Sequence, residues 1–122
     1  MKERQDLKKR TREFALRIIR LFAALPGSVE AQVLGKQVLR SGTSVGAQYR
    51  ESVRAKSDAD FVSKIEGALQ ELEETQYWLE LIGDAEIISV QRLTPLIQEA
   101  EELTAIFVSM VKAVKNKPTS RH

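Results

Sequence analysis

The chain has 122 residues, of which 43% are hydrophobic and 30% charged, and it contains one histidine and no cysteine. This composition is typical of one globular domain, and it excludes a disulfide framework, a cysteine nucleophile and a thiolate metal site. Because the histidine is the last residue, His122, we expect neither histidine catalysis nor histidine metal ligation.

The formal net charge of +2 hides a strong asymmetry along the chain. Residues 1–20 carry eight Lys and Arg against three acids, and residues 21–56 carry five against two. Residues 57–86 then carry one lysine against nine acids, and residues 87–122 carry five basic residues against three acids. This distribution indicates either a polyanionic partner or charge pairing between segments.

The first half of the chain predicts two helices. Apolar residues recur at helical spacing over residues 4–25, and Pro26-Gly27-Ser28 ends this helix. Ser28 is a suitable N-cap for a second helix over residues 29–54. The inward face of the second helix is unusually small, and the glycines within it indicate close approach of a neighbouring helix.

The second half predicts two more helices. Ser57-Asp58-Ala59-Asp60 resembles a capping box and predicts a third helix over residues 58–83. A fourth helix is predicted over residues 90–115, although Pro95 leaves open a start at Thr94-Pro95, because proline suits only a first turn.

The order and spacing of these elements predict the fold class. Strand-like alternation never persists, and four helices with short connections predict an all-α, antiparallel up-and-down four-helix bundle over residues 1–115. Residues 116–122 are expected to form a disordered tail. We expect a cytoplasmic protein with no membrane partner, because no apolar run approaches the roughly 20 residues that cross a bilayer and the N-terminus lacks the apolar segment of a signal peptide.

Two apolar stripes lie outside the predicted core faces. The first helix carries Leu16 and Ile19 on such a stripe, and the third helix carries Tyr77, Trp78 and Leu81. One apolar face per helix is enough for a monomeric bundle, so the extra stripes favour a contact between subunits of a homo-oligomer. The alternative is a wide core with scattered exposed apolar residues.

The third helix also carries a stripe of carboxylates, Glu66, Glu73 and Glu80, at spacings of seven. Di-metal bundles use a Glu-x-x-His arrangement on facing helices, so without a histidine in the helices only an all-carboxylate metal site would be open. Pairing with Lys and Arg of a neighbouring helix or subunit is the favoured interpretation, and a solvated face is the other alternative. We expect no metal and no cofactor, and we assign the stripe to the candidate subunit interface.

The first two helices present basic faces that fit phosphates without reading sequence. The candidate nucleic-acid contacts are Lys9, Arg12, Arg20, Lys36, Arg40, Arg50 and Arg54. The alternatives are pairing of these cations with acids of the same chain or a neighbouring subunit, and a membrane surface that the flanking acids disfavour.

No catalytic motif stands in a plausible context. Gly42-Thr43-Ser44-Val45-Gly46 has the Gly-x-Ser-x-Gly spacing but lies inside a helical pattern and not at a strand-to-helix elbow, no Ser-x-x-Lys pair has a plausible context, and no nucleophile has an evident base. We therefore expect no catalytic residues and no enzymatic activity.

The middle of the chain carries a family resemblance. Residues 40–51, Arg-Ser-Gly-Thr-Ser-Val-Gly-Ala-Gln-Tyr-Arg-Glu, together with Ala55-Lys56-Ser57, Asp60-Phe61, Lys64-Ile65 and residues 71–81, resemble the bacterial four-helix-bundle proteins of the 23S rRNA intervening-sequence family. The branch that it is similar to reads Thr-Ser-Val-x-Ala-Asn-Tyr in its second helix, and Gln48 stands here in place of the Asn. The resemblance spans most of the chain and is specific over about residues 40–82.

The resemblance implies a compact bundle, homo-oligomers that are often pentameric rings, and no established enzymatic activity. A relative of similar fold, the accessory variability determinant of diversity-generating retroelements, is a basic pentamer that associates with reverse transcriptase and nucleic acid. Because fold does not define function, this likeness supports a nucleic-acid hypothesis without transferring a site.

Two functional hypotheses follow. The first is a non-enzymatic, homo-oligomeric accessory protein that binds RNA, DNA or a nucleic-acid enzyme through the basic faces of the first two helices. The second is a protein-interaction scaffold whose basic and acidic helices pair between subunits.

Overall fold

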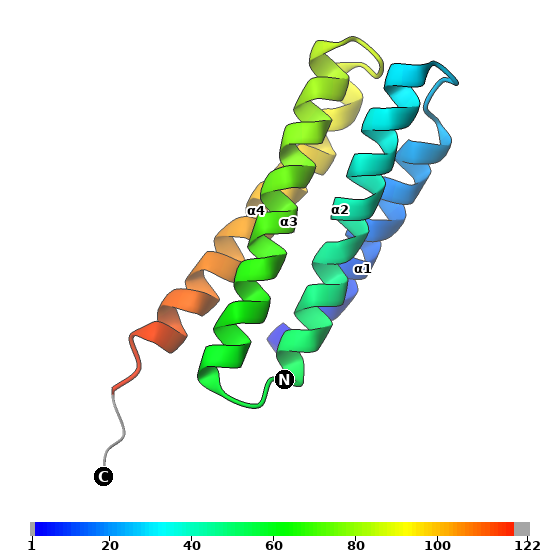
Figure 1. The fold of residues 1–122 in the computed structure, drawn as a ribbon. Coiled ribbons are helices and arrows are strands. Elements are labelled where there is room, and N and C mark those ends of the chain that lie inside the picture. The colour runs from blue at the N-terminus through cyan, green and yellow to red at the C-terminus, as the bar shows by residue number, and fades with distance from the viewer. Residues whose placement is uncertain (1, 119–122) are drawn as a thin grey trace.

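The structure is a computed structural model that describes residues 2–118, with side chains described from Asp6 onward. It contains four helices, α1 (Lys2–Ala23), α2 (Val29–Val53), α3 (Asp58–Asp84) and α4 (Val90–Lys115), and no strand within the described residues. The chain is therefore an all-α, four-helix protein (Figure 1). The last four residues of the predicted tail, 119–122, lie outside the described residues.

Two of the helices begin with the serine N-caps that the sequence predicts. The Ser28 hydroxyl accepts a hydrogen bond from the Ala31 backbone N–H, and the Ser57 hydroxyl accepts one from the Asp60 N–H. The Asp60 carboxylate accepts in turn from the Lys56 N–H at 3.2 Å. These bonds satisfy backbone donors that a helix N-terminus leaves free, so both predicted caps are confirmed.

Pro95 lies inside α4, which begins at Val90 with Ser89 at the N-cap position. The alternative start at Thr94-Pro95 is therefore wrong. Proline removes the one N–H that would have bonded to the Gln91 carbonyl, and the apolar residues on both sides of it, Leu93 and Leu96, are buried in the core. Packing of this face keeps the helix continuous.

The connections lie at alternate ends of the molecule. In Figure 1 the α1–α2 and α3–α4 connections lie at one end, and the α2–α3 connection lies at the other. The packing is uneven, because α2 contacts both α1 and α3 extensively, α3 contacts α4, and α1 meets α4 at only a few points. No Cα atoms of α1 and α3 come within 8 Å of each other, so these two helices occupy diagonal positions of the bundle.

Small residues of α2 bring α1 close. Gly42 lies against Ile18, and Gly46 lies against Thr11. Further along α2, the Tyr49 ring is buried and stacks on Phe107 with centroids 5.8 Å apart. Tyr49 is therefore a core residue.

On its other side α2 meets α3 through buried hydroxyls. The oxygens of Ser41 and Thr75 lie 2.8 Å apart and share a hydrogen bond in a fully buried position. Thr75 also hydrogen-bonds the Glu71 carbonyl at 2.7 Å. The polar atoms of this helix seam are thus satisfied without water.

A methyl group at Gly42 tests the close approach of α1 and α2. It would lie 2.7 Å from Ile18 Cγ1 and 3.0 Å from Cγ2, and Ile18 is fully buried and cannot move aside. We expect Gly42→Ala to lower the free energy of unfolding by about 1–3 kcal/mol, despite the better helix propensity of alanine. Urea denaturation followed by circular dichroism measures the change.

Gly67→Ala is the matched control. A methyl group there would meet only the Gln48 side-chain amide, with its oxygen 3.1 Å away, and the half-buried glutamine can rotate away. Its effect should lie between zero and a gain of about 1 kcal/mol. Equal losses for the two variants would contradict a tight α1–α2 contact at Gly42.

Candidate nucleic-acid and subunit interfaces

All seven predicted nucleic-acid contacts lie at exposed positions. Those on α2, namely Lys36, Arg40, Arg50 and Arg54, follow the helical period and lie on the side away from the core. Those on α1 are Lys9, Arg12 and Arg20. These residues differ in whether they form an ion pair with a carboxylate of the same chain.

Arg40 is held within the chain. Its Nη1 lies 3.2 Å from Glu71 Oε1 and its Nη2 lies 2.6 Å from Glu74 Oε1, so the guanidinium bridges α2 and α3. Sequence reasoning missed both acceptors. Their spacing of three on α3 was the available signal, because residues i and i+3 share a helix face and can flank one guanidinium.

The other six cations have no carboxylate within 4 Å among the residues that the structure describes. The contact of Thr11 with Gly46 sets α1 and α2 in register. Thr11 meets Gly46 whereas Ile18 meets Gly42, so the two helices run in opposite directions and Arg50 lies nearer the level of Lys9 than that of Arg12. We call these six residues the basic surface: Lys9, Arg12, Arg20, Lys36, Arg50 and Arg54.

Arg10, which was not among the predicted contacts, joins α1 to α4. Its Nη2 lies 2.7 Å from Glu99 Oε1 and 3.0 Å from Glu102 Oε1, and its Nε donates to Glu99 Oε2 at 3.1 Å. The hydrogen bond with Glu99 raises the pKa of Arg10 above its usual value. The two-pronged pair with Glu99 and the pair with Glu102 connect α1 with α4, and these helices make few other contacts.

Glu66 is the first carboxylate of the predicted interface stripe, and its Oε2 lies 3.2 Å from Lys115 Nζ of α4. At the same end, Lys117 Nζ lies 2.8 Å from Asp58 Oδ2. Glu51 Oε1 of α2 lies 2.9 Å from Lys64 Nζ, and the hydrogen bond between them raises the pKa of Lys64. Glu66 therefore pairs with a neighbouring helix, one of the alternatives that the sequence leaves open.

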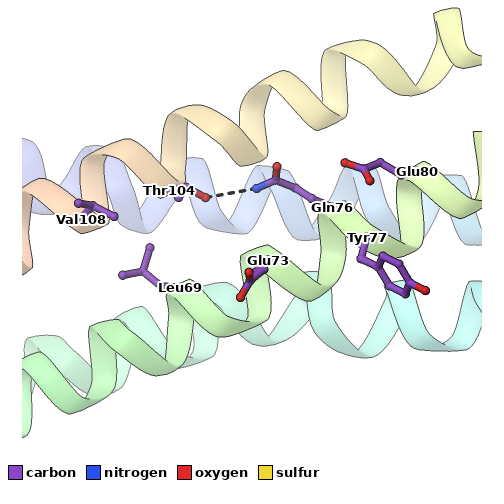
Figure 2. A pocket seen from close by; sticks show the side chains of 7 residues that line it. All are labelled: Leu69, Glu73, Gln76, Tyr77, Glu80, Thr104 and Val108. Atoms are coloured by element: carbon purple, nitrogen blue, oxygen red, sulfur yellow. Dashed lines mark hydrogen bonds between the residues drawn. The ribbon is translucent and has the colours of Figure 1, made fainter.

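Glu73 and Glu80 differ from Glu66. Both are exposed, and neither has a cation within 4 Å among the described residues. They line a hollow of about 460 Å³ between α3 and α4, where Gln76 Nε2 donates to Thr104 Oγ1 at 3.4 Å (Figure 2). Figure 2 shows the Tyr77 ring on the same stretch of α3, pointing away from α4.

The apolar residues of the predicted interface do not form one class. Ile19 is 45% and Tyr77 54% exposed, and Leu16 and Leu81 are half-buried outside the core. Trp78 instead packs against the core, with its Nε1 buried and unpaired among the described residues. Consecutive helix residues differ by about 100° in direction, which turns Trp78 from the side of Tyr77 toward the core.

Further apolar residues are exposed outside the predicted interface. Val29 and Val33, in the first two turns of α2, are 78% and 55% exposed, and Val53 and Val90 are 43% and 54% exposed. Single exposed valines of this kind are common on protein surfaces.

The described residues contain no group of three or more Asp, Glu, His or Cys that could hold a metal. None of the four helices, over the residues described, has an apolar stretch long enough to cross a membrane.

Comparisons with known proteins show which family the chain is similar to. The family model described as 23S rRNA-intervening sequence protein matches residues 3–109. A solved structure from Bacteroides thetaiotaomicron, described as a protein with unknown function from the S23 ribosomal protein family, is 40% identical with a TM-score of 0.82, covering 87% of this chain and 98% of that chain. No curated protein matches.

Replacing Arg10 tests the link between α1 and α4. We expect Arg10→Gln to lower the free energy of unfolding by about 1 kcal/mol, because the pair has two-pronged geometry but stays partly exposed to solvent. Arg12→Gln, which removes an arginine without a carboxylate partner in the described residues, should change it by less than about 0.5 kcal/mol. A double-mutant cycle with Glu99→Gln, measured by urea denaturation, isolates the pair, and a coupling near zero would contradict its role.

Proposed function

The chain belongs to the 23S rRNA-intervening sequence protein family, and from this premise we propose that it is a non-enzymatic, homo-oligomeric accessory protein that binds nucleic acid or a nucleoprotein through the basic faces of α1 and α2. The observation that carries the proposal is the basic surface itself. Its six cations are exposed and have no carboxylate within 4 Å among the described residues. Exposed guanidinium and ammonium groups without internal partners are free to neutralise phosphates.

The chemistry of the basic surface favours contacts to phosphates over contacts to bases. Its cations lie on two straight, adjacent helices, and Tyr77, the exposed aromatic ring of the described residues, lies on α3. Without an aromatic platform among the cations, stacking on unpaired bases has no support there. We therefore propose recognition of the phosphate backbone, in which affinity depends strongly on salt and weakly on sequence.

The proposed unit of assembly is an antiparallel up-and-down bundle, which the alternate placement of the connections in Figure 1 supports. The family resemblance favours a pentamer of these units. A cytoplasmic location also belongs to the proposal. The fold itself carries no function, so the proposal depends on the basic surface and not on the bundle.

Nucleic-acid binding is tested with a fluorescently labelled RNA and the duplex DNA of the same sequence. We expect the logarithm of the binding constant to fall linearly with the logarithm of the salt concentration, with a slope of about −0.9 per duplex phosphate neutralised and about −0.7 per single-strand phosphate. The double variant Arg50→Glu with Arg54→Glu should reduce binding at least about tenfold and flatten the slope by about two, because two phosphate contacts are lost.

Two further variants sharpen this test. Arg40→Glu should weaken binding less than Arg50→Glu, because the Arg40 guanidinium already lies beside Glu71 and Glu74. Lys112→Glu, a reversal at an exposed position of α4, should weaken binding by no more than the general change in net charge requires. Absence of binding at low salt, or an equal loss for all of these reversals, would contradict the proposed surface.

The second candidate function is a protein-interaction scaffold in which basic and acidic helices pair between subunits. The exposed, unpaired carboxylates Glu73 and Glu80 on α3 favour it, because they are suitable acceptors for the basic surface of another copy. This scaffold predicts that reversals of α2 cations, such as Arg50→Glu, dissociate the oligomer, whereas the nucleic-acid proposal predicts that they leave its mass unchanged. Sedimentation equilibrium of the same variants separates the two.

A further inference from the structure

The outward face of α1 combines exposed apolar and basic side chains. Leu16 and Ile19 lie outside the core, and Ile19 is 45% exposed. Lys9 and Arg12 lie on the same stripe toward the N-terminus, and Arg20 follows Ile19. We call these five residues the cationic face of α1; none of its three cations is within 4 Å of a carboxylate in the part of the chain described.

The outward face of α3 also combines apolar and charged side chains, but its charges are negative. Tyr77 is 54% exposed, and Leu81 lies one turn further along, half-buried and outside the core. Glu73 and Glu80 lie on the stripe beside them, exposed and without a cation within 4 Å among the described residues (Figure 2). We call these four residues the acidic face of α3.

We propose that the acidic face of α3 is a docking surface for a second copy of this chain, and that the segment which docks there is the cationic face of α1. This inference rests on the homo-oligomeric part of the proposed function and names its contact. Each face has a small apolar centre flanked mainly by charges of one sign, with Glu13 as an acid beside the α1 cations, and the two faces carry opposite net signs. Contact between them buries the four apolar side chains together and gives each unpaired carboxylate an available cation.

The dimensions of the two faces agree. At a rise of 1.5 Å per residue, the stretch from Lys9 to Arg20 is about 16 Å long and the stretch from Glu73 to Leu81 is about 12 Å long. Two helices crossing at a shallow angle contact each other over such lengths, and i, i+3 and i+4 spacing of the side chains gives the ridges that interlock. A helix of the second copy is thus long enough to cover the whole acidic face.

The diagonal placement of α1 and α3 decides the type of assembly. These helices do not contact each other within the bundle, so their outward faces lie on different sides of it. One copy can therefore offer its α1 to one neighbour and its α3 to another at the same time. Such a head-to-tail contact is heterologous, and it closes into a ring or continues as a filament according to the rotation between copies.

The docking leaves the outward side of α2 uncovered. Lys36, Arg50 and Arg54 lie on α2 and not on the cationic face of α1, so these cations are repeated once per copy along the assembly. Repetition of a weak phosphate-binding surface raises the overall affinity for a long polyanion through multivalency. The docking thus uses the α1 part of the basic surface, Lys9, Arg12 and Arg20, and leaves its α2 part to nucleic acid.

Charge reversal on each face, followed by exchange, tests the docking. The acidic-face variant is Glu73→Lys with Glu80→Lys, and the cationic-face variant is Arg12→Glu with Arg20→Glu. At a protein concentration where the wild type is an oligomer by sedimentation equilibrium, each double variant should sediment with a mass near the 13.8 kDa of one chain. Circular dichroism and urea denaturation should match the wild type, because all four positions are exposed.

Exchange separates docking from unspecific damage. An equimolar mixture of the two double variants should regain the oligomeric mass, because each then offers a face complementary to the other. The quadruple variant should regain it by itself for the same reason. The matched control, Lys112→Glu with Glu101→Lys, reverses one cation and one acid at exposed positions of α4 and should keep the wild-type mass.

The results that would overturn the docking are equally specific. A monomeric wild type at every concentration measured, double variants that keep the oligomeric mass, or a mixture that stays monomeric would each do so. Failure of the nucleic-acid proposal is distinguishable, because it would appear as absence of RNA and DNA binding with the mass changes intact. Failure of the docking would leave the effect of Arg50→Glu with Arg54→Glu on binding intact.

Discussion

The close approach of α1 to α2 is the constraint on which the rest of the structure depends. Gly42 and Gly46 carry no side chain, so Ile18 and Thr11 of α1 can lie directly against the α2 backbone. This contact joins the two basic segments of the chain, which repel each other. Burial of apolar residues such as Phe14 and Val38 outweighs the repulsion between charges that stay in water, because exposed charges are screened while buried apolar area is not.

The two basic helices lie side by side, and most of the acidic residues lie on the other two helices, so ion pairs form across the seams between the halves. Arg40 joins α2 to Glu71 and Glu74 of α3, and Arg10 joins α1 to Glu99 and Glu102 of α4. These pairs occupy the cations that face a neighbouring helix. The six cations of the basic surface have no carboxylate within 4 Å in the described part of the chain.

The proposed function rests on which charges the fold leaves unpaired. An exposed cation interacts only weakly with a distant charge, but six cations on two adjacent helices produce a positive electrostatic potential that can attract a polyanion. The carboxylates on the outward face of α3 are the complementary case. The separation of the two faces by the diagonal of the bundle lets one subunit use both at once.

The sequence by itself determined the all-α, four-helix class, the helix caps at Ser28 and Ser57 and the family, because periodicity, capping and a motif over residues 40–51 are local properties of the chain. It also predicted correctly that the seven candidate nucleic-acid contacts lie at exposed positions. Only the tertiary structure decided that Pro95 lies inside a continuous helix, that Trp78 packs against the core, and that Arg40 and Glu66 have partners within the chain. The reason is that the ion pairs of Arg40 and Glu66 join residues 31 to 49 positions apart, so the partner of each charge depends on which helices pack together and in what register.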